Sequence, residues 1–213
     1  MASVDFNKKI IYLHVPKTAG TYIQYILMVY YNMPTYNYCA PDYKKNAFSY
    51  KGVGLSTFYN NSEFLEIIGQ TKESIKDFFK IASVRNPYTK FISAWKFMIQ
   101  NNLIDKDVDL EDVIKNKDNY SGIVYNHLFL SQYDHLKEWD IDYLIKLETL
   151  EDDINIALKI CGIEKIHVPE FKNKTDSYGD PMQNFKNKNV LTFVNDHFHE
   201  DFERYGYSKI LID

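Results

Sequence analysis

The stretch HVPKTAGTYIQYIL, residues 14–27, decides the fold of this chain. The residues that lead into it, KKIIYL, are β-branched and aromatic, as in a strand, and the residues after Gly20 have helical spacing until Pro34 stops the helix. A strand that ends in a tight loop and continues into a helix points the free N–H groups of that helix outward. The stretch therefore predicts a bound phosphate or sulfate.

The loop PKTAGTY within this stretch carries the groups that such an anion needs. The small residues Ala19 and Gly20 let the main chain approach closely. Thr18 and Thr21 add hydroxyl donors, and Lys17 adds a mobile positive charge. The loop is not a Walker A motif, GxxxxGK(S/T), because its lysine precedes the glycine. Taken alone, it is equally compatible with an ordinary turn and a solvated lysine.

The stretch IASVRNPYTKFISAW, residues 81–95, repeats this arrangement. Arg85 follows the apolar strand residues, Pro87 suits the start of the next helix, and Ser93 lies about two turns along it. Only Arg85 and Arg204 are arginines among the 25 basic residues, which suggests that position 85 needs a planar guanidinium. Arg85 and Ser93 are predicted to bind a second phosphate, and the alternative is a structural salt bridge at Arg85.

Apolar segments alternate with amphipathic ones along the chain. Strands are predicted at 10–15, 80–84 and 141–148, helices at 21–33, 88–99, 124–139, 148–162 and 191–204, and mainly loop at 34–62. This alternation indicates an α/β fold, a parallel sheet with helices on both faces, in which ligands bind at the carboxyl ends of the strands. The length of 213 residues suits a single domain, 1–213.

Composition excludes several other classes of protein. A net charge of −4 argues against a general electrostatic grip on nucleic acid or on an anionic membrane, so the anion site must be local. Two cysteines are too few for a disulfide framework. The sequence shows no secretory signal and no membrane span, which predicts a cytoplasmic protein.

Five blocks of the sequence together resemble the Golgi-type carbohydrate sulfotransferases. HVPKTAGT is similar to their 5′-phosphosulfate loop and VRNPYTKFISAW to their 3′-phosphate segment. NHLFLSQYDHL, IDYLIKLETLEDD and HEDFERYGY resemble three further blocks, in the same order. The resemblance implies a P-loop-NTPase-like fold and, as co-substrate, 3′-phosphoadenosine 5′-phosphosulfate (PAPS). It also implies a hydroxyl-bearing acceptor, expected to be a carbohydrate.

Carried over to this sequence, the resemblance implies a role for each loop residue. Lys17 would contact the oxygen that bridges phosphate and sulfate, and Arg85 and Ser93 would hold the 3′-phosphate. The 5′-phosphate would be wrapped by the remaining loop residues, Thr18, Ala19, Gly20 and Thr21, with Tyr22 beside them. A cation and helix N–H groups aimed at the departing phosphate oxygen would stabilise the transition state more than the ground state.

The sequence departs from the family pattern at three points. Tyr22 stands where the family usually has Ser, and Lys90 stands where it usually has Arg. Many relatives have a catalytic His between the two phosphate segments, whereas residues 28–84 contain none, and Gly54 stands at the nearest local resemblance. The base must come from elsewhere, the acceptor must differ, or activity is weak or lost.

His127 is the first candidate for the missing base, because a neutral imidazole suits proton abstraction; a packing role is the alternative. His14 is expected to be structural, since strand alternation turns it away from the ligand. The acidic residues Glu63, Glu66 and Glu73 are interpreted as solvated charges. The tyrosines Tyr30, Tyr31, Tyr36, Tyr38 and Tyr43 are interpreted as packing residues or as the wall of an acceptor cleft.

Three features of the sequence bear on functions other than sulfuryl transfer. The cluster NDHFHEDFE is interpreted as a solvated amphipathic helix, so no metal is expected. A nucleotide kinase is disfavoured because the sequence lacks GK(S/T) and a clear Mg²⁺ carboxylate after a strand. A nucleotide-binding protein that has lost catalysis is the remaining alternative.

Overall fold

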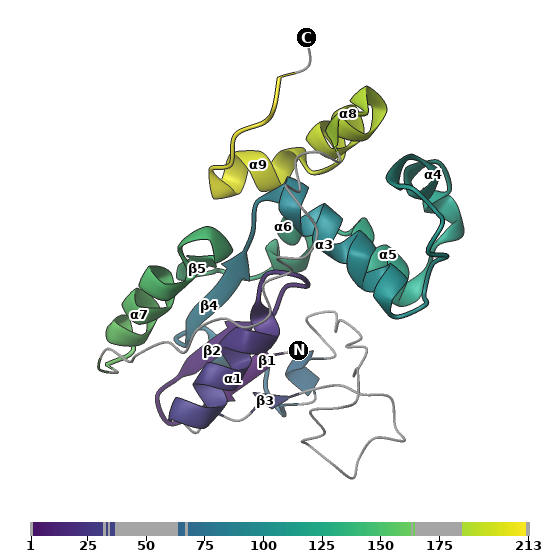
Figure 1. The fold of residues 1–213 in the computed structure, drawn as a ribbon. Helices are drawn as coiled ribbons and strands as arrows, with labels where there is room; N and C mark the ends of the chain where they lie inside the picture. The colour runs from purple at the N-terminus through teal and green to yellow at the C-terminus, as the bar shows by residue number, and fades with distance from the viewer. Residues whose placement is uncertain are drawn as a thin grey trace.

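The computed structural model describes residues 2–31, 33, 35–36, 64–66, 68–162, 164 and 185–211. These residues form a five-stranded sheet in the order β3-β1-β2-β4-β5 (Figure 1). Its strands are β1 (Ala2–Asp5), β2 (Ile10–Leu13), β3 (Thr35–Tyr36), β4 (Phe79–Val84) and β5 (Tyr143–Lys146). β2 is parallel to β4 and β4 to β5, whereas β1 is antiparallel to β2 and to β3.

The parallel part of the sheet confirms the strands predicted at 10–15, 80–84 and 141–148. The sequence prediction missed β1, which joins β2 through a tight turn. Asp5 starts this turn, because its carboxylate accepts hydrogen bonds from the main-chain N–H groups of Asn7 and Lys8. A hairpin of this kind needs no helix, so the antiparallel strand extends the sheet away from β4.

One face of the sheet is covered by α1 (Gly20–Tyr31) and α7 (Leu150–Ile160). Tyr12, Ile81 and Ile145, one from each parallel strand, point to this face and are at most 2 % exposed. They pack against apolar residues of both helices, namely Ile23, Ile26, Leu27, Ile154, Ala157 and Leu158. The acidic first turn of α7 agrees with the helix predicted there.

The other face of the sheet is covered by α6 (Gln132–Leu136), by α9 (His199–Tyr205) and by residues around 64–78. Ile11 and Ala82, the neighbours of the residues on the first face, point here and are fully buried. Period-two alternation of apolar residues thus places a core on each side. Helices cover both faces, as predicted for this α/β fold.

A second group of helices extends from the carboxyl end of β4 (Figure 1). It comprises α3 (Pro87–Gln100), α4 (Leu110–Lys115), α5 (Gly122–Leu128) and α8 (Lys188–His197), with the 3₁₀ turn η3 (Lys117–Asn119) between α4 and α5. Two further 3₁₀ turns, η2 (Glu73–Ile75) and η4 (Leu147–Thr149), lie before β4 and after β5. Phe91, Met98 and Val194 lie at the centre of its core and are fully buried. This core holds α3 in place beside the sheet edge.

Two predicted helices are each divided in two. The helix expected at 124–139 is α5 and α6, because Ser131 caps a new helix by accepting from the N–H of Asp134. The helix expected at 191–204 is α8 and α9, which are separated at Phe198. The polar interval that follows α3 contains α4, capped by Asp109, which the sequence prediction missed.

The register of the sheet aligns the carboxyl ends of its three parallel strands, β2, β4 and β5. Leu13 pairs with Ala82 on β4, and Val84 pairs with Lys146 on β5. The chain therefore leaves β2, β4 and β5 at one edge of the sheet. Both junctions singled out by the sequence, after β2 and after β4, lie at this edge.

Candidate functional site

The loop between β2 and α1 is tightly curled. Lys17 and Ala19 have positive φ angles of 65° and 63°, which cost an L-residue about 1–2 kcal/mol each. The carbonyl of Ala19 accepts the first helical hydrogen bonds, from the N–H groups of Tyr22 and Ile23 at 2.9 and 3.1 Å. The N–H groups before them have no partner inside the helix, and the first turn of α1 contains no acidic residue. Such an array is suited to an anion.

Gly20 is needed for a reason that the sequence did not reveal. The imidazole of His14 occupies the space of a side chain at this position, since a Cβ there would lie only 2.1–2.5 Å from three ring atoms. The ring is fixed by its Nδ1, which lies 3.0 Å from Gln24 Oε1, and the Gln24 amide donates to Ser3 Oγ. Burial lowers the pKa of His14 to about 3, so the imidazole is neutral. These contacts support the structural role expected for His14.

The two threonines of the loop differ in environment. Thr18 is fully buried, and its hydroxyl donates to the carbonyl of Val15 at 2.8 Å and lies 2.7 Å from Ser83 Oγ. Ser83 Oγ lies in turn 2.6 Å from the hydroxyl of Tyr12. Thr18 therefore ties the loop to β4 through its side chain and can offer a ligand only its main chain. Thr21 is exposed, so its hydroxyl remains open to solvent.

Tyr22 and Lys90 mark two departures from the family pattern. The ring of Tyr22 packs against the core between α1, α7 and the sheet. Lys90 is 1 % exposed, and its ammonium donates to the carbonyl of Leu130 at 3.0 Å. Burial lowers the pKa of Lys90 to about 8, against the opposing effect of Asp201. Both side chains thus have partners within the protein.

The ammonium of Lys17 lies on an aromatic ring. Its Nζ is 4.0 Å from the centre of the Phe97 ring, near the end of α3. The imidazole of His127, on α5, stacks on the same ring with centroids 5.4 Å apart and an interplanar angle of 11°. Burial, and then the charge of Arg85, lower the pKa of Lys17 to about 8. Phe97 thus joins the candidate site, whereas its sequence context predicts only a helical position.

Arg85 connects the two junctions. Its Nη1 donates to the carbonyl of Lys17 at 3.3 Å, and its Nε donates to Thr89 Oγ1 at 2.8 Å. Asn86 caps α3 by accepting from the N–H of Tyr88, and Pro87 follows as the first helical residue. The guanidinium is therefore held between the end of β4 and the curled loop.

One face of α3 continues this site. Thr89, Ser93 and Phe97 recur every fourth residue and are all half-buried, so they form a stripe from Arg85 towards the ammonium of Lys17. Ser93 lies on this stripe, about two turns along α3, but the hydroxyl that Arg85 contacts is that of Thr89. The sequence signal for Thr89 is its spacing, because a hydroxyl four residues after Arg85 can lie within reach of the guanidinium.

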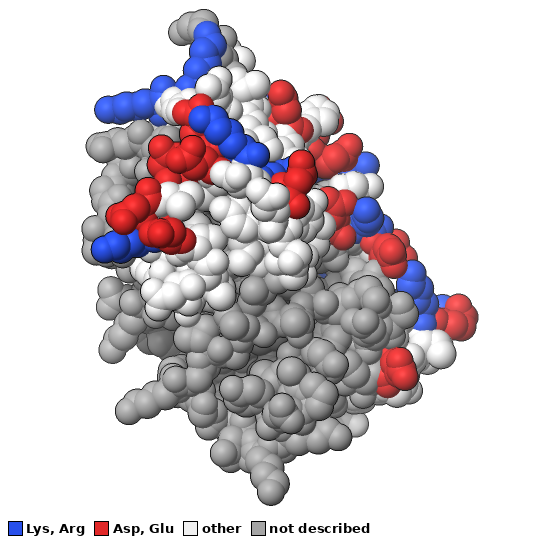
Figure 2. Space-filling model, turned by 90° about the vertical axis from the view of Figure 1, so that its right-hand side faces the viewer, with Lys and Arg blue, Asp and Glu red and all other residues white. Residues whose placement is uncertain are grey.

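Positive charge is concentrated at this place. Arg85 lowers the pKa of both Lys17 and Lys96, after burial. Within the described part of the chain, no carboxylate forms a salt bridge with Lys17 or Arg85. On the face drawn in Figure 2, by contrast, basic and acidic side chains are interspersed. The site is thus a local cationic cluster in a chain of negative net charge.

A carboxylate and a phenol flank the main chain after Arg85. Glu148 Oε1 accepts from the N–H of Asn86 at 2.8 Å, and Glu148 Oε2 accepts from the hydroxyl of Tyr207 at 2.9 Å. Burial lowers the pKa of Arg85, and the charge of Glu148 opposes this effect. The ammonium of Lys146 lies 5.0 Å from the centre of the Tyr207 ring. The ends of β4 and β5 and the residues just after α9 therefore meet beside the guanidinium.

Other candidates from the sequence have ordinary positions or fall outside the described residues. Glu66 and Glu73 are exposed. Glu63, Gly54 and the side chains of the tyrosine cluster lie outside the described residues. Among the residues placed by the structure, no group of His, Cys, Asp and Glu is arranged to hold a metal ion. No helix among them is long and apolar enough to cross a bilayer.

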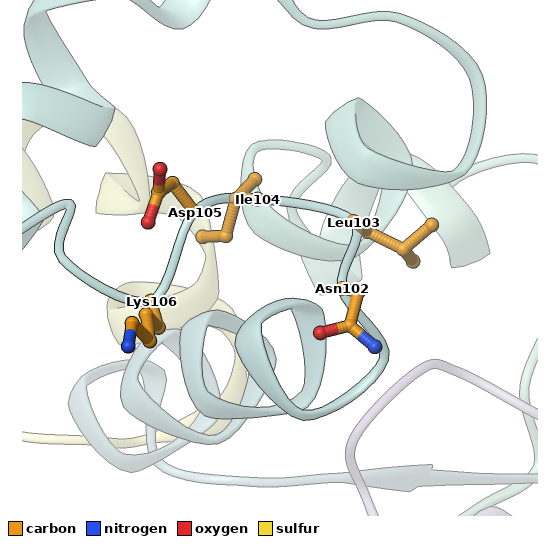
Figure 3. Close-up of a pocket in the computed structure, with 5 residues that line it drawn as sticks. All are labelled: Asn102, Leu103, Ile104, Asp105 and Lys106. Atoms are coloured by element: carbon orange, nitrogen blue, oxygen red, sulfur yellow. The ribbon is translucent and has the colours of Figure 1, made fainter.

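A surface hollow lies at the turn after α3 (Figure 3). It is lined by Asn102, Leu103, Ile104, Asp105 and Lys106. Their side chains point in different directions rather than towards one centre. Ile104 belongs to the helical core, at 8 % exposure. The hollow therefore has no set of convergent polar groups that would bind a ligand.

Comparison with known proteins assigns the chain to a family. The model of the sulfotransferase family matches residues 2–208, which includes both junctions and all five sheet strands. No curated protein and no solved structure gives a match. The chain belongs to the sulfotransferase family, so it is a transferase with a P-loop-like α/β fold. Its activity is sulfuryl transfer in the general sense.

Proposed function

We propose that the protein transfers the sulfuryl group of PAPS to a hydroxyl group of a glycan or glycoconjugate. One observation carries the proposal: Arg85 Nη1 lies 3.3 Å from the carbonyl of Lys17. This contact joins two cationic junctions at the carboxyl ends of neighbouring parallel strands. A ligand with two separate anionic groups matches such a pair, and PAPS carries a 3′-phosphate and a 5′-phosphosulfate.

The loop residues suit the chemistry of this transfer. The acceptor oxygen forms a bond to sulfur while the bond from sulfur to the bridging oxygen breaks, which leaves negative charge on the 5′-phosphate. The N–H groups of the curled loop, at Thr18, Ala19, Gly20 and Thr21, and the ammonium of Lys17 would stabilise this charge. Arg85 and Ser93 would hold the 3′-phosphate, which leaves with the bisphosphate product.

The proton of the acceptor hydroxyl must go to a base. His127 stays the prediction for this role, but it is 5 % exposed and stacks on Phe97. Its environment therefore favours the packing alternative. The two roles are separable by experiment, because phenylalanine preserves a stacked ring and removes the proton acceptor.

Calorimetry with adenosine 3′,5′-bisphosphate tests the donor. We expect the protein to bind this nucleotide more tightly than ATP-Mg²⁺, and Arg85→Ala to remove most of the preference. Arg204→Ala is the matched control, because Arg204 is exposed and pairs with Glu200 on α9. A preference for ATP-Mg²⁺ would contradict the proposal and support a kinase.

Transfer from labelled PAPS to a panel of glycans tests the reaction and the acceptor. We expect labelled glycan from the wild type and almost none from Lys17→Ala, while Lys106→Ala, at the turn after α3, keeps full activity. Tight binding of the bisphosphate without labelling of any hydroxyl compound would support a nucleotide-binding protein without catalysis.

A further inference from the structure

The side chain of Gln132 forms a two-point contact with the main chain of Arg85. Its Oε1 accepts from the Arg85 N–H at 2.8 Å, and its Nε2 donates to the Arg85 carbonyl at 2.9 Å. Gln132 is fully buried, at the first position of α6. Both main-chain polar groups of Arg85 are thus held by one carboxamide, at the point where the chain leaves β4.

Asp201, on α9, holds Gln132 in turn. Asp201 Oδ2 accepts from the main-chain N–H and from the side-chain amide of Gln132, at 3.0 and 3.2 Å. Asp201 Oδ1 accepts from the N–H of Tyr133 at 2.7 Å. Asp201 is fully buried as well. Its three hydrogen bonds orient the carboxamide that Arg85 needs and fix the start of α6.

Lys90 closes this network from the side of α3. Its ammonium donates to the carbonyl of Leu130, two residues before Gln132. Lys90 forms no salt bridge within the described residues. The charge of Asp201 acts on Lys90 and opposes the effect of its burial. Three stretches that are distant in the sequence, around 85–90, 130–133 and 201, therefore form one buried polar unit.

We infer that Gln132 and Asp201 are positioning residues for Arg85, and that through Arg85 they set the selectivity of the site for a nucleotide with a 3′-phosphate. This inference rests on the proposed function. The guanidinium contacts the loop and Thr89, whereas both polar groups of the Arg85 main chain are held by Gln132. A bidentate contact of arginine with phosphate depends on orientation, so a displaced main chain weakens it.

The test compares adenosine 3′,5′-bisphosphate with AMP, which lacks the 3′-phosphate. Gln132→Glu is nearly isosteric, but it replaces the amide donor by an oxygen opposite two acceptors, the Arg85 carbonyl and Asp201. We expect it to lower the affinity for the bisphosphate roughly tenfold, the scale of one lost hydrogen bond, and to leave the affinity for AMP unchanged. Asp201→Asn, which leaves Gln132 in place, is expected to act in the same direction.

Asn195→Asp is the matched control for these variants. It makes the same amide-to-acid change at a buried site on α8, where the Asn195 amide donates to the carbonyl of Ile210. It should lower the melting temperature and leave the ratio of the two affinities unchanged. In the Arg85→Ala background, Gln132→Glu should no longer change that ratio, because the residue it positions is absent.

The outcomes separate this inference from the proposed function. If the wild type does not prefer the bisphosphate to AMP, the proposed function fails. If the wild type prefers it and folded Gln132→Glu and Asp201→Asn keep the full preference, the positioning role is overturned. An equal loss of affinity for both nucleotides would also overturn it, because that result indicates general damage to the site.

Discussion

The ammonium of Lys17 lies 4.0 Å from the centre of the Phe97 ring. An aromatic face attracts a cation without neutralising it, unlike a carboxylate. The charge of Lys17 therefore stays available to an anionic ligand while its position is restrained. His127 stacks on the same ring, so the contact depends on a residue of α5 as well.

Replacement of Phe97 tests this restraint. Phe97→Leu keeps an apolar side chain but removes the ring, whose attraction for a cation amounts to about 0.5–2 kcal/mol. We expect a several-fold lower kcat and a further decrease in the pKa of Lys17, because the ring favours the charged form. The measurement is the pH profile of sulfuryl transfer, in which Phe97→Tyr should match the wild type. An unchanged profile in Phe97→Leu would show that the ring has no influence on Lys17.

The pKa of Lys17 predicts a loss of binding at alkaline pH. Burial and Arg85 lower it to about 8, so the ammonium loses its proton as the pH rises through this value. We expect the affinity for adenosine 3′,5′-bisphosphate to decrease there. Lys17→Arg should flatten the profile, because a guanidinium stays protonated.

This comparison also accounts for Lys90, whose pKa is about 8 as well. Lys90 is present in both proteins, so its titration contributes equally to both profiles. Calorimetry at pH values on both sides of 8 provides the measurement. The same alkaline decrease in Lys17→Arg would assign it to another group.

Gly20→Ala is expected to destabilise the protein by about 1–3 kcal/mol, the usual cost of an overpacked site. The added methyl group would lie 2.1–2.5 Å from atoms of the His14 ring. Denaturant unfolding measures the loss. The double variant His14→Ala with Gly20→Ala should recover part of it, since the ring that clashes is gone. Additive losses in the double variant would refute the steric explanation.

Thr18→Val is expected to reduce stability rather than ligand affinity. It removes the hydroxyl between Val15 and Ser83, so the buried Val15 carbonyl loses this donor and Ser83 keeps only its contact with Tyr12, at a cost of about 1–3 kcal/mol. Unfolding and nucleotide titration should be measured on the same preparation. Thr21→Val, at the exposed threonine, is the control and should show the opposite pattern. A stable Thr18→Val protein with weak nucleotide binding would restore the predicted role of its hydroxyl.

His127→Phe distinguishes a base from a packing residue. We expect it to keep most of the activity, because a ring still stacks on Phe97, and His127→Ala to lose about 2–5 kcal/mol of stability from the cavity. Transfer rates from labelled PAPS decide between the roles. A decrease of about 10²–10⁴-fold in folded His127→Phe is the size of a general-base effect and would make His127 the base.

Local patterns predicted much of the fold and both junctions. The strands β2, β4 and β5 are compact apolar runs, and their alternation with helices specified a parallel sheet. β1 was missed because it is recognisable mainly from its pairing with β2, which no local pattern reveals. The break between α5 and α6 was missed because a serine cap inside a helical pattern gives a weak signal.

The sequence predicted those residues of the candidate site whose place follows from the neighbouring strand or helix. Lys17 and Arg85 follow strands, so their place at the sheet edge could be inferred from position. Phe97 and Gln132 could not be assigned to the site, because they reach Lys17 and Arg85 through tertiary contacts. Thr18 was assigned to the ligand by its residue type, whereas burial against Ser83 commits its hydroxyl to the protein.

The contacts around Arg85 can form only in a certain order while the chain is being synthesised. A ribosome releases the N-terminal part of a chain first. The loop around Lys17 can therefore meet β4 early, but Gln132, Asp201 and Tyr207 become available only one after another. Tyr207 reaches Glu148, which holds the N–H of Asn86. A nascent chain can thus complete the junction at Arg85 only after Tyr207 has left the ribosome, more than a hundred residues after Arg85 itself.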